Sequence, residues 1–227
     1  MAEFDRFALN YDDALNAGLS TTGETKEFFA RGRIQCLSRR LRELGIRAGS
    51  VMDFGCGTGS TTSLLRELLG ADRVFGVDVS EGLLDVARRQ HPAPGVTFNT
   101  PKAWPSRVEV DLVYCNGVFH HIEPSQRPEY VRFVCSALRR GGIFALWENN
   151  PWNPGTRLVM SRIPFDRDAK LMSAWQAQRL LRREGLDPLG VEYAFVFPHF
   201  LEALRPLERY LSGWPLGGQY QVLAKRP

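Results

Sequence analysis

Three closely spaced glycines are the feature of this sequence that most directly indicates a ligand site. In the stretch VMDFGCGTGS, an apolar run ends in Asp53, and Gly55, Gly57 and Gly59 then alternate with small residues before a helical pattern begins. Glycine destabilises both a strand and a helix, so its use here indicates that a ligand approaches the backbone closely. The free N–H groups at the start of the following helix favour an anionic group. The stretch therefore predicts a turn that binds a cofactor with a negative end and a flat ring.

A second acid, Asp78, lies at the end of the next expected strand, 19 residues after Gly59. A carboxylate there can accept hydrogen bonds from both hydroxyl groups of an unphosphorylated ribose. A dinucleotide requires the spacing G-x-G-x-x-G for its pyrophosphate, whereas this loop has G-x-G-x-G. Asp53 also disfavours a pyrophosphate and suits an ammonium group. A cofactor that carries both an amino acid and an adenosine fits all of these residues, and a nicotinamide-dependent oxidoreductase is the disfavoured alternative.

These residues need a scaffold in which the ends of several strands meet. Strand-like and helix-like segments alternate from about residue 50 to residue 150, which predicts parallel strands joined by right-handed crossovers, with helices on both faces of the sheet. Ligands bind such sheets beyond the carboxyl ends of the strands. Two late strands are expected to pair antiparallel at the sheet edge. The expected helices span 24–44, 61–69, 81–90, 128–139 and 173–184, and the expected strands span 50–54, 73–79, 96–99, 110–116, 142–148, 191–197 and 219–226.

Four motifs, VMDFGCGTG, VFGVDVS, VDLVYCNGVFHHI and LRRGGIFALWE, resemble in order and spacing the class I S-adenosylmethionine-dependent methyltransferases over about residues 45–150. The resemblance implies a three-layer αβα, Rossmann-like methyltransferase fold, whose doubly wound, mostly parallel seven-stranded sheet has an antiparallel last strand. It implies S-adenosyl-L-methionine as cofactor, S-adenosyl-L-homocysteine as product, and a small-molecule acceptor such as a natural product, a sugar or a related metabolite. One domain (1–227) is expected, with an N-terminal lid and helix (1–45), a cofactor-binding core (46–150), an acceptor-side insertion (151–190) and a terminal strand pair (191–227).

The resemblance also implies the cofactor contacts, position by position. Asp53 would anchor the amino group directly or through water, Asp78 would bind the ribose hydroxyls, and Val79 would lie against the adenine. The acid that the family often carries after the third strand is replaced by Thr100, so backbone contacts or a stacked side chain would have to recognise the adenine. The predicted cofactor contacts are Asp53, Gly55, Cys56, Gly57, Thr58, Gly59, Asp78, Val79, Thr100, Pro101, Asn116 and Gly117.

Two adjacent histidines follow the fourth expected strand, at the edge where the ligand is expected. The methyl group of a sulfonium is already activated, so in-line transfer mainly requires that the acceptor is positioned and water excluded. An imidazole suits proton transfer near neutrality, so we predict His121, ahead of His120, as a general base, with a bracing role as the alternative. Glu148 is another candidate base, and Tyr11 is a candidate for an N-terminal lid. The spacing of the histidines to Glu123 fits no common metal-binding pattern, so no metal is predicted.

The segment 148–173 follows the fifth expected strand and is rich in amide, guanidinium and aromatic side chains. Amides and guanidinium groups suit acceptors that carry hydroxyl, carboxylate or phosphate groups. The alternative is that the amides satisfy the backbone of their own loop. Together with the opening and closing segments, this stretch resembles a bacterial subgroup of small-molecule methyltransferases. The predicted substrate contacts are Asn149, Asn150, Trp152, Arg157 and Arg162.

Composition provides the remaining expectations. A length of 227 residues, with 44% hydrophobic and 24% charged residues, fits one soluble domain. The net charge is only +4, and the basic pairs are scattered along the chain. After the fourth expected strand the sequence reads NGVF, where methyltransferases that act on DNA amino groups carry an N-P-P-Y-type tetrad. A nucleic-acid substrate is therefore a less favoured alternative. A cytoplasmic location is predicted because the cysteines are widely spaced, the N-terminus lacks an apolar core and no stretch is long enough to span a membrane. The sequence leaves the oligomeric state undetermined. A cofactor-binding protein that does not methylate is a further alternative, as is contact of segment 199–216 with a membrane surface.

Overall fold

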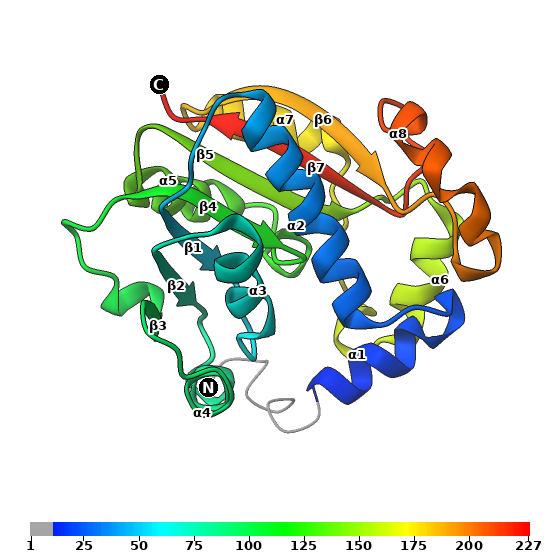
Figure 1. Ribbon diagram of the computed structural model, residues 1–227, viewed down its shortest axis with the longest axis horizontal. Helices are drawn as coiled ribbons and strands as arrows, with labels where there is room; N and C mark the ends of the chain where they lie inside the picture. The colour runs from blue at the N-terminus through cyan, green and yellow to red at the C-terminus, as the bar shows by residue number, and fades with distance from the viewer. Residues whose placement is uncertain (1–10) are drawn as a thin grey trace.

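One seven-stranded sheet, in the order β3-β2-β1-β4-β5-β7-β6, runs through the centre of the structure, a computed structural model that describes residues 11–227, with side chains from Asp13 onward (Figure 1). Strand β7 pairs antiparallel with β5 and with β6, and the remaining strand pairs are parallel. The predicted sheet with its antiparallel last strand is therefore confirmed. The strands are β1 (Ser50–Phe54), β2 (Arg73–Val77), β3 (Val96–Asn99), β4 (Val110–Asn116), β5 (Leu138–Asn149), β6 (Asp187–Ala194) and β7 (Gln219–Lys225).

Helices cover both faces of the sheet and divide its core into two main clusters. On one face α2 and α3 pack against the sheet through Ile34, Leu37 and Leu65, and on the other face α5 and α7 pack through Val134 and Leu181. All five residues of β1 are buried, as expected for a central parallel strand that is covered on both sides. The helices are α1 (Tyr11–Leu19), α2 (Lys26–Glu43), α3 (Ser60–Leu69), α4 (Glu81–Gln90), α5 (Arg127–Ala137), α6 (Pro154–Arg162), α7 (Ala174–Arg183) and α8 (Glu208–Leu211).

Side-chain caps fix where several of these helices begin. Thr25 accepts a hydrogen bond from a backbone N–H in the first turn of α2, and Ser80 does the same for α4. Ser173 and Gln176 form a reciprocal capping box at the start of α7. These caps set the direction in which each helix leaves the sheet, and thereby the shape of the edge where the strands end.

Three helices and the starts of two strands differ from the sequence prediction. Helices α1, α6 and α8 were not predicted, and β5 begins at Leu138 instead of residue 142. Figure 1 shows α1 and α6 next to each other beyond the ends of β4 and β5. Asn153 caps α6 and Pro154 occupies its first position, so the NPG sequence begins a helix rather than only a turn. Strand β6 begins at Asp187 because an edge strand tolerates Pro188 at an irregularity in its pairing.

The described part of the chain contains no helix with the length and apolar character needed to cross a membrane. All four cysteines are free thiols.

Candidate functional site

The glycine loop connects β1 to α3 and is bent so that its first position, residue 55, has no room for a side chain. Gly55 has a φ of +77°, and a Cβ built on it would lie 2.1 Å from Val118 Cγ2. Its N–H donates to the carbonyl oxygen of Val77 at 2.7 Å, which ties the loop to the end of β2. Both the backbone conformation and the lack of space therefore require glycine at this position.

Asp78, at the end of β2, holds this loop from the other side. Its Oδ2 accepts a hydrogen bond from the N–H of Gly57 at 2.9 Å, and its Oδ1 accepts one from the N–H of Ser80 at 2.9 Å. The carboxylate is thereby fixed between the first and second strand ends. Its contact with a ribose stays a prediction.

Asp53 lies in β1 just before the loop and is only 2% exposed. Its Oδ2 accepts a hydrogen bond from the hydroxyl of Thr62 at 2.7 Å. Burial raises the pKa of Asp53 to about 7, and the neighbouring charge of Asp78 acts in the same direction. A carboxyl group with a pKa near neutral pH therefore lies next to the glycine loop.

A cavity of about 290 Å³ begins where β4 ends, at Asn116 and Gly117. Asn116 Oδ1 is buried and has no hydrogen-bond partner, so the cavity presents an unsatisfied acceptor at its inner end. Three positively charged side chains, Lys26, Arg33 and Arg205, also line the cavity. Most of the wall is apolar and consists of Leu15, Leu19, Phe28, Phe29, Val159, Met160, Ile163, Phe165, Phe195, Val196, Phe197 and Pro198.

A chain of hydrogen bonds runs along one side of the cavity. The guanidinium of Arg33, which is 6% exposed, donates through Nε to the Tyr114 hydroxyl at 3.1 Å and through Nη1 to Gln219 Oε1 at 3.0 Å. Gln219 Nε2 in turn donates to Asn149 Oδ1 at 3.0 Å. The hydrogen bonds of Arg33 therefore go to neutral groups, and its charge is available to an anionic ligand in the cavity.

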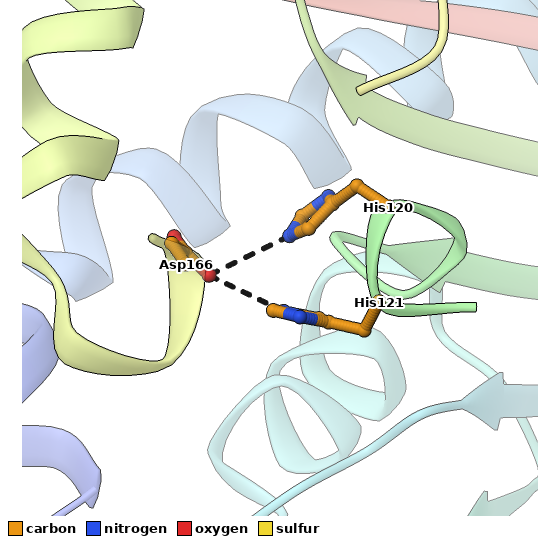
Figure 2. A group of neighbouring side chains, drawn as sticks. All are labelled: His120, His121 and Asp166. Carbon is orange, nitrogen blue, oxygen red and sulfur yellow. Dashed lines mark ion pairs between the residues drawn. The ribbon is translucent and has the colours of Figure 1, made fainter. Parts of the chain in front are cut away.

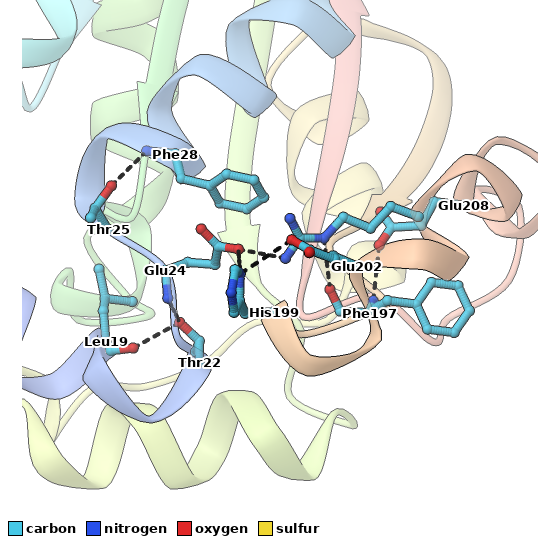
Figure 3. Close-up of polar contacts among 10 residues, drawn as sticks. Leu19, Thr22, Glu24, Thr25, Phe28, Phe197, His199, Glu202 and Glu208 are labelled. Atoms are coloured by element: carbon cyan, nitrogen blue, oxygen red, sulfur yellow. Dashed lines mark hydrogen bonds and ion pairs between the residues drawn. The ribbon is translucent and has the colours of Figure 1, made fainter.

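Two segments far apart in the sequence both line the cavity, and Figure 3 shows the polar contacts between them. Glu24, before α2, accepts a hydrogen bond from Arg205 Nη2 at 2.6 Å and also lies 3.1 Å from His199 Nδ1. The guanidinium of Arg205 lies over the ring of Phe28, with 4.6 Å between Cζ and the ring centroid. These contacts join the start of α2 to the segment 199–207.

The turn after β6 adds a strained residue to the same wall. Phe195 has a φ of +62°, which is unusual for a residue other than glycine. Glu208 accepts hydrogen bonds from the N–H groups of Phe195 and Phe197, and the Phe195 ring packs against Phe29 and Trp147. Because the packing and the carboxylate hold it, the strained turn keeps an aromatic ring at the cavity.

The adjacent histidines lie at the inner end of the cavity, where Figure 2 shows them facing Asp166. His121 Nε2 lies 3.2 Å from Asp166 Oδ1, and His120 Nε2 lies 3.6 Å from the same oxygen. His120 Nδ1 lies 2.6 Å from Glu148 Oε2, and Glu148 Oε1 accepts a hydrogen bond from the N–H of Phe119 at 2.8 Å. Within the described chain, these are the residues whose side chains are grouped closely enough to hold a metal ion: His120, His121 and Asp166.

Burial and charge act in opposite directions on His120. Burial alone would lower its pKa, but the charge of Glu148 and the hydrogen bonds of Asp166 and Glu148 outweigh burial and raise the pKa of His120 to about 10. Without a bound ligand, His120 is therefore a protonated group between two carboxylates. It does not have the free lone pair that a general base needs.

Sequence comparison gives the family of this fold. Residues 51–142 match the family described as methyltransferase domain. Over 164 residues the chain is 30% identical to the trans-aconitate 2-methyltransferase of Rhodopseudomonas palustris (strain BisB18), a match that covers 72% of this chain and 59% of that protein. Residues 51–142 therefore form a methyltransferase domain of the class I, S-adenosylmethionine-dependent type.

Solved structures of methyltransferases share the fold. An S-adenosylmethionine-dependent methyltransferase of Thermotoga maritima has a TM-score of 0.66 at 16% identity, over 99% of this chain and 98% of that one. One of Mesorhizobium loti has a TM-score of 0.60 at 22% identity, over 83% and 96%. The chain spans about three-fifths of the length of the Rhodopseudomonas relative.

The residues around the loop fit S-adenosylmethionine, the cofactor of this family, in two respects. The turn at Gly55 is closed against Val118, and the unpaired Asn116 Oδ1 near it offers an acceptor for the cofactor. Val79 is 51% exposed at the end of β2, as an apolar wall for a flat ring would be. Cys56 is buried, and burial raises the pKa of its thiol well above the usual range, so it serves as a small residue rather than a nucleophile.

The predicted catalytic residues occupy different positions in the structure. His120 and His121 line the cavity, whereas Glu148 lies behind His120 with both carboxylate oxygens engaged. The side chain of Glu148 is fully buried and contacts His120, and its role as a base stays a prediction. The side chain of Tyr11 lies outside the described part of the chain.

Of the predicted substrate contacts, only Asn149 lines the cavity. Asn150 donates its amide to the carbonyl oxygens of Pro215 and Gly217, so it satisfies the backbone of a neighbouring loop. The side chains of Trp152, Arg157 and Arg162 are exposed and are not part of the cavity wall. Substrate contact by these four residues stays a prediction, while the structure gives them structural or surface positions, with Arg157 and Arg162 on α6. The sequence analysis missed Phe28, Arg33, Met160, Asp166, Phe195, Arg205 and Gln219.

Proposed function

We propose that this chain transfers the methyl group of S-adenosylmethionine to a small-molecule acceptor bound in the 290 Å³ cavity. The observation that carries the proposal is the position of this cavity. It begins at Asn116 and Gly117, next to the glycine loop, and leads outward between α1, α2 and α6. An acceptor in it would lie between the cofactor and the apolar wall.

The lining of the cavity favours an acceptor with an apolar body and an anionic group. Phenylalanine rings and aliphatic side chains form most of its surface, while the buried guanidinium of Arg33 has neutral hydrogen-bond partners. Relatives named trans-aconitate 2-methyltransferase support a carboxylic acid. The phenylalanines favour an acid with a larger apolar part than trans-aconitate.

The residues of the chain would mainly position and shield the acceptor. Bound S-adenosylmethionine would supply an activated methyl group: the acceptor's lone pair would bond to the methyl carbon as the S–CH3 bond breaks, with S-adenosylhomocysteine as the leaving group. The apolar wall would exclude water from this reaction, and Arg33 would orient the anionic group. His121 lines the cavity and is our candidate for contact with the attacking atom of the acceptor. If that atom is a hydroxyl oxygen, His121 is also our candidate for the general base.

Formation of S-adenosylhomocysteine in the presence of candidate acceptors tests this function. We expect turnover with carboxylic acids that have an aromatic or branched apolar part, and weaker turnover with the corresponding neutral amides. The cofactor's binding is measured separately by calorimetry. Binding of the cofactor without turnover on any acceptor of the panel would favour the non-methylating alternative, and no binding would contradict the family's cofactor in this chain.

Cofactor affinity should rise between pH 5 and pH 7. The pKa of Asp53 is about 7 in the free protein, so its carboxyl is largely protonated below that value, whereas a nearby ammonium group favours the carboxylate. Binding would then release a proton, and affinity would increase by at least about tenfold over this range. Calorimetry in buffers of different ionisation enthalpy measures both the affinity and the proton.

Asp53→Asn should flatten this pH dependence, while Asp72→Asn, at an exposed acid after α3, should leave it unchanged. A wild-type affinity that does not vary with pH would show that Asp53 does not interact with the cofactor's ammonium group, directly or through water.

A further inference from the structure

The cluster of His120, His121 and Asp166 has the arrangement of a metal site. Both Nε2 atoms are directed at one carboxylate oxygen, as Figure 2 shows, and the ligand atoms of the three residues lie within 4.8 Å of one another. We propose that this cluster binds a divalent transition-metal ion at the inner end of the acceptor cavity.

The separations between these atoms match those of ligands that share one ion. Bonds from a metal to nitrogen or oxygen are about 2.0–2.2 Å long, so two ligands on one ion are about 2.8–3.6 Å apart. The two nitrogen–oxygen separations in the cluster are 3.2 and 3.6 Å. Two imidazoles and one carboxylate leave coordination positions open for an acceptor oxygen, and imidazole ligands favour Zn²⁺, Fe²⁺ or Ni²⁺ over Mg²⁺ and Ca²⁺.

A buried carboxylate orients one of the two imidazoles in the way that metal sites require. Glu148 lies 2.6 Å from His120 Nδ1, and its other oxygen is fixed by the backbone N–H of Phe119. When Nδ1 donates its proton to Glu148, the lone pair of Nε2 points toward Asp166. Metal-binding histidines are held by such carboxylates in many proteins.

The two segments that carry the ligands are tied together by their backbones. The N–H of Lys170 donates to the carbonyl oxygen of His120 at 2.7 Å. Arg127 donates to the carbonyl oxygens of Ile122 and Lys170, one on each segment. The ligands are therefore preorganised even though Asp166 lies 45 residues after His121 in the sequence.

This inference rests on the proposed function, because it takes the acceptor to lie in the cavity. It changes the role proposed for His121. An ion at the cluster would bind an acceptor oxygen and lower the pKa of an attached proton. His121 would then activate the acceptor as a metal ligand instead of as a free base. The competing arrangement is the metal-free cluster, in which a protonated His120 bridges Glu148 and Asp166.

The test uses the full chain, freed of any affinity tag and stripped with a chelator. Calorimetric titration with Zn²⁺ gives stoichiometry and affinity, visible absorption with Co²⁺ reports the ligand field, and Mg²⁺ serves as comparison. The variants are Asp166→Asn, His121→Asn and Glu148→Gln. Matched controls are Asp168→Asn, an exposed acid in the same loop, and His91→Gln, after α4. Cofactor binding is measured on every sample.

We expect one ion per chain in the wild type and in both controls. Loss of a ligand in Asp166→Asn or His121→Asn should weaken Zn²⁺ binding by at least about 100-fold, and Glu148→Gln should weaken it about 10–100-fold. Absence of one-to-one binding in the wild type overturns the proposal, as does unchanged affinity in the folded ligand variants. Because cofactor binding is scored independently, a protein that binds S-adenosylmethionine but no ion retains the proposed function and loses only the metal site.

Discussion

Replacing Gly55 by alanine is expected to abolish detectable cofactor binding and to lower the melting temperature by about 4–24 °C. The left-handed backbone at this position costs an L-residue about 1–3 kcal/mol. The new methyl group would lie 2.1 Å from Val118 Cγ2, and overpacking of this kind costs a further 1–3 kcal/mol, roughly. At roughly 2–4 °C per kcal/mol for a chain of this size, the two effects give the stated range. Thermal denaturation and cofactor calorimetry measure the two consequences.

Gly70→Ala is the matched control for this change. Gly70 also has a positive φ, +64°, but a Cβ there would meet no atom within 4 Å. Its substitution should cost only the backbone term, about 1 kcal/mol, and leave cofactor affinity unchanged. If Gly55→Ala bound the cofactor as tightly as the wild type, the glycine loop would not be the cofactor site.

Asp78→Asn is expected to weaken cofactor binding by about 100-fold or more while the chain remains folded. Hydrogen bonds to a charged acceptor contribute about 1.5–3 kcal/mol each, and a neutral amide would retain only part of two such bonds to ribose hydroxyls. The amide oxygen can still accept from one of the backbone donors that Asp78 now serves, Gly57 or Ser80. Calorimetry with S-adenosylhomocysteine measures the affinity, and circular dichroism verifies the fold.

Asp85→Asn provides the same chemical change at a position outside the proposed cofactor site. Asp85 is exposed on α4 and pairs with Arg88 at 2.9 Å, an interaction worth at most about 1 kcal/mol. It should bind the cofactor like the wild type. Equal affinities for the two variants would remove Asp78 from the cofactor site.

The parts of the site that are local in sequence were predictable. The glycine loop and the acid at the end of β2 each depend on a few consecutive residues, because a strand, a turn and a helix N-terminus are local structures. The alternation of strands and helices likewise predicted the sheet and its antiparallel last strand. These features are determined by residues that are neighbours along the chain.

The acceptor side was less predictable because it is assembled from distant segments. Asn149 and Asn150 are adjacent, yet one lines the cavity and the other bonds to a loop, and only the end of β5 decides which. The sequence around Asp166 contains no motif that indicates a functional role. Asp166 lies near the histidines because the chain after α6 folds back toward the sheet. Phe195 lines the cavity because Glu208 stabilises an unusual backbone angle, which the phenylalanine itself does not indicate.

The position of β7 between β5 and β6 has a consequence for synthesis on the ribosome. Strands β1 to β5 can pair as they emerge, but β6 has no neighbour in the described sheet other than β7. The hydrogen bond between Asn149 and Gln219 also awaits β7. The nascent chain must therefore carry β6 as an unpaired strand until β7 leaves the exit tunnel, and this interval is when chaperones would have most to protect.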